Sequence, residues 1–216
     1  MRCILLEGTA AGGMNMKKSL NTRRMVTLAM LSAILLMMSF TPLGYLNVGP
    51  LAISLNMIPV GIAAMALGCG GGAFLGAVFG ITSFLQCMGI GGTSAMGVIL
   101  FEISPVLAFV QRFVPRLLAG FLSGLVYSGM KKLTNSTVAG FVTGFCAALL
   151  NTVLFMLSLV LCFGHTQYIQ ELIGGRNIIL FICTFVGFNA VVEMFATTAV
   201  VGLVGRVMNQ VVFSRR

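Results

Sequence analysis

The chain has 216 residues, of which 58% are hydrophobic and only 8% are charged. Soluble domains carry about 25% charged residues, so this composition excludes an ordinary soluble protein and indicates a chain that lies in a lipid bilayer. The formal net charge of +9 is explained by basic residues beside membrane helices, and we do not expect nucleic-acid binding.

A basic tail precedes the apolar part of the sequence. We assign residues 1–23 to the cytoplasm, because the segment MNMKKSLNTRR directly precedes the first apolar run. Residues 1–13 lack the pattern of a cleavable signal peptide. We interpret them as a start-site extension, because the compact basic segment begins at Met14 or Met16; the alternative is a short disordered tail.

Six apolar segments make up the predicted membrane domain, residues 24–210. They cover about 25–42, 56–67, 73–88, 106–130, 137–163 and 177–208. A helix needs about 20 residues to cross the bilayer. Loops are predicted at 43–55, 89–105 and 165–176, with a tight turn at 68–72 and a basic tail at 211–216. Barrel strands would alternate apolar and polar residues, whereas these segments are apolar on all faces. We therefore predict an all-α membrane protein with six transmembrane helices.

The second segment is short for a complete crossing, so we expect part of the loop before it to lie at membrane depth. An orientation with both termini in the cytoplasm follows from the distribution of basic residues. It leaves only Arg112, Arg116 and Arg176 of the thirteen basic residues on the outer side, in agreement with the positive-inside rule.

Small residues recur at four-residue spacing in several segments, a pattern that lets membrane helices approach closely. Most of these stripes are expected to serve packing within the chain: Gly72, Gly76 and Gly80; Gly120 and Gly124; Gly140 and Gly144. The stripe of Ala29 and Ala33 lies on the first helix, and it is the best candidate for docking to a partner membrane protein.

Three polar residues lie inside the last two segments. Glu193 is near the middle of the sixth, Asn189 is one turn earlier on the same face, and Asn151 is in the middle of the fifth. Carboxylates at this depth are costly and normally face a cavity or a partner. These residues therefore predict a polar pocket between the two helices, with a structural interhelical hydrogen bond as the alternative.

Two arginines share a face of the fourth segment, because Arg112 and Arg116 are four residues apart. Two guanidinium groups are suited to bind a carboxylate or a phosphate. The alternatives are pairing with Glu102 or Glu171, or extension of the side chains to lipid headgroups.

No catalytic or metal-binding motif is present in the sequence. The glycine-rich stretch at 68–80 lacks the GK[ST] ending of a P-loop, so the chain does not hydrolyse ATP itself. The six cysteines and the single histidine, His165, lack metal-ligand spacing. We expect no cofactor, no metal and no enzymatic activity.

Several stretches together resemble one family of membrane proteins. They are TPLGY at 41–45, IPV at 58–60, GAFLGAVFG at 72–80, RFVPRLLAG at 112–120, Asn151 with Thr152, and Asn189 with Glu193. Over residues 24–210 the chain resembles the substrate-binding S components of energy-coupling factor (ECF) vitamin transporters.

The resemblance implies a six-helix protein of a prokaryotic cell membrane that binds a vitamin from outside. The pocket would be formed largely by helices 4–6 and capped by the loop between helices 1 and 2, which contains Tyr45. Ala29 and Ala33 match the face that docks onto a transmembrane T component, which two ATPase subunits drive. The S component is expected to topple in the membrane to release its cargo.

The resemblance ranks pantothenate first as the substrate, followed by riboflavin and folate. An anionic vitamin suits Arg116, and a polyhydroxy amide suits Asn151 and Asn189. Other classes remain open on the residues alone: an autonomous permease or channel, an intramembrane enzyme based on Glu193, and a scaffold without a ligand.

Overall fold

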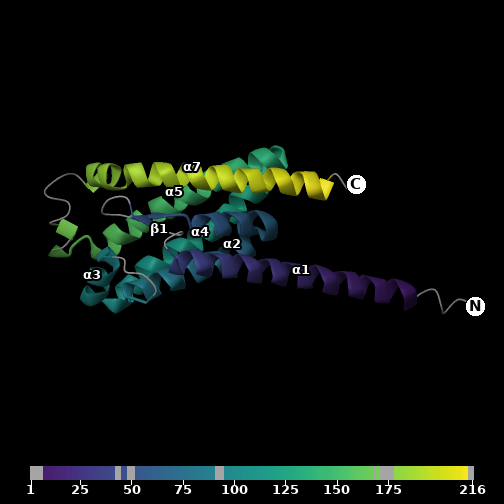
Figure 1. Cartoon of the computed structure of the whole chain (residues 1–216), viewed down its shortest axis with the longest axis horizontal. Helices are drawn as coiled ribbons and strands as arrows, with labels where there is room; N and C mark the ends of the chain where they lie inside the picture. The colour runs from purple at the N-terminus through teal and green to yellow at the C-terminus, as the bar shows by residue number, and fades with distance from the viewer. Residues whose placement is uncertain are drawn as a thin grey trace, which may run out of the picture.

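The computed structural model describes residues 7–41, 45–47, 52–90, 95–167, 169–170 and 178–213. Within these ranges, the side chains of 7–21, 45–47, 52–53, 95, 178–189 and 208–213 are outside the description. The elements are α1 (Glu7–Phe40), β1 (Tyr45–Asn47), β2 (Ala52–Ser54), α2 (Met57–Cys87), α3 (Ala95–Ile103), α4 (Pro105–Leu133), α5 (Ser136–Phe163) and α7 (Ile178–Phe213). In Figure 1, α1 begins and α7 ends at the same end of the bundle, and α3 lies at the opposite end.

Five of the described helices are long and apolar enough to cross a bilayer: α1 over Thr22–Phe40, α2, α4, α5, and α7 over Ala190–Val207. Their outward surfaces are hydrophobic; Val106, Leu161 and Phe195, for example, are each more than 70% exposed. A soluble protein rarely exposes so much apolar surface, but lipid covers it without cost. The predicted all-α membrane class is confirmed.

Helix α2 folds back on itself at Gly68. This glycine has φ 75° and ψ −160°, a conformation that residues with a Cβ rarely adopt. A Cβ on Gly72 would lie 3.1 Å from the Cβ of Ala64, although eight residues of straight helix would separate them by about 12 Å. The two arms, 57–67 and 69–87, therefore supply the second and third predicted segments. The predicted turn is correct in position, but Gly68 alone leaves the helical conformation.

Glycines bring α4 against the second arm of α2. A Cβ on Gly80 would lie 2.9 Å from the Cα of Phe113, and one on Gly124 would lie 2.6 Å from the main-chain nitrogen of Cys69. A Cβ on Gly72 or on Gly120 would run into the main chain of the other residue. These contacts confirm intramolecular packing for the two stripes on α2 and α4, and they fix the arginine-bearing helix against α2.

Helix α1 packs against α2 near its carboxyl end. Leu31 and Leu35 enter the core, and a buried hydrogen-bond network closes the contact. In this network the Gln86 amide donates to the Ser39 carbonyl oxygen at 2.6 Å, and the Ser39 and Thr82 hydroxyls are 3.3 Å apart. The candidate membrane part of α1 is nevertheless the least buried of the five.

The segments 43–55 and 89–105 were predicted as loops, but both contain regular structure. Strands β1 and β2 form an antiparallel pair in which Tyr45 is opposite Ser54. Helix α3 lies in the predicted loop 89–105, where its apolar residues Met96 and Leu100 pack into a core cluster. A helix of nine residues is only about 14 Å long. It is too short to cross the bilayer, so the segment was not recognised as a membrane helix.

Candidate functional site

The two predicted arginines are buried against aromatic rings. Arg112 and Arg116 are 7% and 5% exposed. The Arg116 guanidinium carbon lies 4.6 Å from the ring centre of Phe79 and 5.1 Å from that of Phe155. Arg112 lies 5.2 Å from the same Phe155 ring. Aromatic faces stabilise a buried cation. Their burial inside the bundle contradicts extension to lipid headgroups.

Main-chain and hydroxyl groups hold the arginines in place. Arg116 Nη1 donates to the carbonyl oxygen of Arg112 at 2.8 Å. Arg112 Nη1 lies 3.5 Å from the Ser83 hydroxyl on the second arm of α2. Pro115 between them is also buried. The buried face of α4 therefore presents two oriented cations to the interior of the bundle.

Helices α5 and α7 bring together Asn151 and Glu193, which the sequence assigned to a polar pocket or, alternatively, to an interhelical hydrogen bond. Asn151 Nδ2 donates to Glu193 Oε1 at 3.3 Å, and each residue is 7% exposed. Glu193 also interacts electrostatically with Arg116 and with the main-chain amide of Ser54 on β2. We refer to Arg112, Arg116, Asn151 and Glu193 as the polar cluster. The residues of the cluster come from α4, α5 and α7. Strand β2, which lies between α1 and α2 in the chain, approaches the cluster at Glu193.

Two further polar side chains are completely buried, and each is near one of these residues in the sequence. Gln111 precedes Arg112 on α4, and Asn56 follows β2 at the start of α2; both are 0% exposed. Neither side chain has a hydrogen-bond partner among the described residues, on nitrogen or on oxygen. Neither residue was among the predicted site residues. Gln111 could have been predicted, because it is an amide beside an arginine within an apolar segment. The sequence around Asn56 indicates only the start of a helix.

The remaining predicted site residues are placed by their elements alone. Asn189 lies on α7 one turn before Glu193, and Tyr45 lies on β1 opposite Ser54; the side chains of Asn189 and Tyr45 are outside the described residues. The β-hairpin is nevertheless beside α7, because β2 contacts that helix. Among the described residues, no three His, Cys, Asp or Glu side chains gather as a metal site would require.

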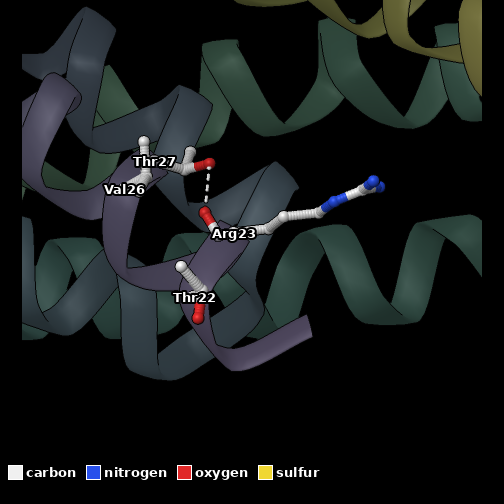
Figure 2. A pocket seen from close by; sticks show the side chains of 4 residues that line it. All are labelled: Thr22, Arg23, Val26 and Thr27. Carbon is white, nitrogen blue, oxygen red and sulfur yellow. Dashed lines mark hydrogen bonds between the residues drawn. The ribbon is translucent and has the colours of Figure 1, made fainter. Parts of the chain in front are cut away.

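The predicted docking residues, Ala29 and Ala33, are both exposed on α1. An open hollow of about 490 Å³ lies nearby on the same helix, lined by Thr22, Arg23, Val26 and Thr27. Figure 2 shows the Arg23 side chain extending away from its helix and the Thr27 hydroxyl donating to the Arg23 carbonyl oxygen. All its lining comes from one helix, and it shares no residue with the polar cluster.

Known proteins are similar to this chain over most of its length. The family described as "ECF transporter, substrate-specific component" matches residues 23–205. A protein named pantothenate transporter PanT, from Leuconostoc mesenteroides subsp. mesenteroides, is 29% identical over 198 residues, which cover 87% of this chain and 92% of the relative. A protein named pantothenic acid transporter PanT, from Lactococcus lactis subsp. cremoris, is 28% identical over 210 residues, which cover 90% and 99%. The chain therefore belongs to the family of ECF transporter substrate-specific components, which are transport proteins and not enzymes.

Proposed function

We propose that this chain is the S component of a prokaryotic cell-membrane transporter for pantothenate. The observation that carries the proposal is the polar cluster, in which two buried cations lie on one helix and one of them, Arg116, interacts with the hydrogen-bonded pair of Asn151 and Glu193. Both relatives named above are pantothenate transporters by name, which supports the same substrate here.

Pantothenate matches the chemistry of this cluster. It has a carboxylate at one end, a secondary amide in the middle and hydroxyl groups at the other end. Arg116, supported by Arg112, would bind the carboxylate through charge-assisted hydrogen bonds. Asn151 and Asn189 would bind the amide and hydroxyl groups, and Glu193 would accept a hydrogen bond from a hydroxyl.

We propose that the β-hairpin closes over the ligand. The Ser54 amide already interacts with Glu193, and Tyr45 is paired with Ser54 across the hairpin. A ligand bound at Glu193 would therefore lie within reach of this hairpin. The main chain of the hairpin would exclude water from the polar cluster, which strengthens electrostatic interactions inside it.

Transport would require partners, because the chain has no nucleotide-binding motif. We propose that Ala29 and Ala33 dock onto a transmembrane T component, which is driven by two ATPase subunits. The exposure of both alanines on the least buried helix supports this assignment, since small residues let two membrane helices approach closely.

Isothermal titration of the purified protein with pantothenate, riboflavin and folate tests the substrate. We expect tight binding of pantothenate and weaker or undetectable binding of the other two. Arg116→Met should weaken pantothenate binding strongly and leave the binding of neutral pantothenyl alcohol nearly unchanged. Tighter binding of riboflavin or folate would contradict the proposed substrate, and equal losses for both pantothenate compounds would contradict the role of Arg116.

Vesicle transport tests the mode of action. The protein alone should not accumulate pantothenate in proteoliposomes, and uptake should appear when the T component and both ATPases are added with ATP. Sustained uptake by the protein alone would indicate an autonomous permease.

A further inference from the structure

We propose that Gln111 and Asn56 are ligand-binding residues, which bind an amide- or hydroxyl-bearing part of the ligand while the arginines bind its anionic part. The proposal rests on the proposed function and adds two specificity-determining side chains to it. It comes from two carboxamides that are completely buried and have no hydrogen-bond partner among the described residues.

Gln111 lies on the buried face of α4 at the level of the arginines. Its main-chain carbonyl oxygen is 3.5 Å from the Ser158 hydroxyl on α5. That hydroxyl also donates to the carbonyl oxygen of Phe155, whose ring contacts both arginines. Gln111 therefore belongs to the same layer of the bundle as the polar cluster.

The burial of Gln111 carries an energetic cost that no described contact offsets. Its side chain is 0% exposed, and neither Nε2 nor Oε1 has a hydrogen-bond partner among the described residues. Buried polar groups are almost always hydrogen-bonded, because desolvation without a partner is unfavourable. A methionine would fill a similar volume without this cost. A ligand that supplies both a donor and an acceptor explains why a carboxamide occupies this position.

Asn56 repeats the pattern at the start of α2. Asparagine at a helix N-cap normally accepts a hydrogen bond from the first turn, but Asn56 has φ −65° and ψ −14° and makes no such bond. Its side chain is completely buried, and Nδ2 and Oδ1 have no partner among the described residues. Asn56 follows Ser54 by two residues, and the Ser54 amide interacts with Glu193. Asn56 is therefore close in the chain to the main-chain group that β2 brings to the polar cluster.

The chemical class of the ligand follows from these two carboxamides. Each one offers N–H donors and a carbonyl acceptor. A ligand that satisfies them must present donors and acceptors together, as a secondary amide or a set of hydroxyl groups does. Combined with the buried arginines, this describes an anion that also carries amide or hydroxyl groups. Pantothenate is such a molecule.

Gln111→Met provides a sharp test, because Gln86→Met is a matched control. Both glutamines are buried, but the Gln86 amide donates to the Ser39 carbonyl oxygen. In the ligand-free protein, Gln86→Met should lower the melting temperature, whereas Gln111→Met should leave it unchanged or raise it. With ligand, Gln111→Met should raise the Kd for pantothenate by about tenfold or more, since a single hydrogen bond can account for this factor. Asn56→Leu should act in the same direction.

Pantothenyl alcohol separates this inference from the role of the arginines. It keeps the amide and hydroxyl groups of pantothenate, so Gln111→Met should weaken the binding of both compounds by similar factors. If the unaltered protein binds pantothenate and both Gln111→Met and Asn56→Leu keep the same affinity for it, this inference is wrong and the proposed substrate still stands. Failure of the unaltered protein to bind pantothenate would overturn the proposed substrate. The melting comparison would still decide on Gln111, because a lower melting temperature for Gln111→Met would identify a structural role and refute the inference.

Discussion

A single added methyl group at Gly76 should disturb both the packing of the bundle and the position of Arg116. The Cβ of an alanine at this position would lie 3.1 Å from the Arg116 carbonyl carbon and 3.2 Å from the Leu117 Cα. It would be closer still to the Arg116 carbonyl oxygen. These atoms belong to the main chain of α4, so no change of side-chain rotamer can relieve the contact.

The second arm of α2 and α4 must therefore move apart to accommodate Gly76→Ala. Overpacking of this kind costs about 1–3 kcal/mol. Alanine in place of glycine recovers about 1 kcal/mol through helix propensity. Gly129→Ala is the matched control, because Gly129 lies on α4 and a Cβ there would meet no atom within 4 Å. The control keeps the propensity term and lacks the packing term.

Thermal unfolding in detergent compares the two variants. One kcal/mol corresponds to about 2–4 °C for a protein of this size, so Gly76→Ala should melt about 2–12 °C below Gly129→Ala. Its affinity for pantothenate should also fall, because the moved main chain carries Arg116 away from the Phe79 ring. Equal melting temperatures for the two variants would refute the close contact between α2 and α4.

Further variants test the charge at the site, the docking face and the reversal of α2 at Gly68. Glu193→Gln should weaken pantothenate binding by up to about tenfold, because a neutral amide oxygen accepts a weaker hydrogen bond than a carboxylate does. Co-purification with the T component should stay intact, and unchanged affinity in titration would remove Glu193 from the site. Ala29→Leu or Ala33→Leu should prevent co-purification with the T component and leave vitamin binding intact, so loss of binding in either variant would contradict a docking role. Gly68→Ala should lower stability by about 1–3 kcal/mol, because φ 75° and ψ −160° form a conformation that is essentially confined to glycine. Gly70→Ala is the control, because a Cβ there meets nothing within 4 Å, and equal stability of the two variants would argue against the sharp reversal.

The class of the protein and the order of its apolar segments could be predicted from the sequence. Apolar runs, glycine spacing and the placement of basic residues are local properties of the chain. Bilayer thickness sets the length of the predicted helices, and the basic residues predict their orientation. The stripe of Gly72, Gly76 and Gly80 also indicated close packing, because a helix with such a stripe has a flat face wherever it is placed.

The partners within the site depended on the tertiary structure. The sequence predicted that Asn151 and Glu193 meet between their helices, and the structure joins them by a hydrogen bond. A hydropathy pattern, however, contains no information on which face of α4 lies beside this pair. The contact between β2 and Glu193 could not be predicted either, because β2 lies in a segment that was predicted only as a loop.

The sequence by itself determined that this is an all-α membrane protein of the ECF substrate-specific type with unusual buried charges. Only the tertiary structure decided that Arg112 and Arg116 stack on Phe155, and that Gln111 and Asn56 are buried without partners among the described residues. The physical reason is that hydrophobicity and helix formation are set by neighbours along the chain. Whether a polar atom finds a partner is set by every helix packed around it.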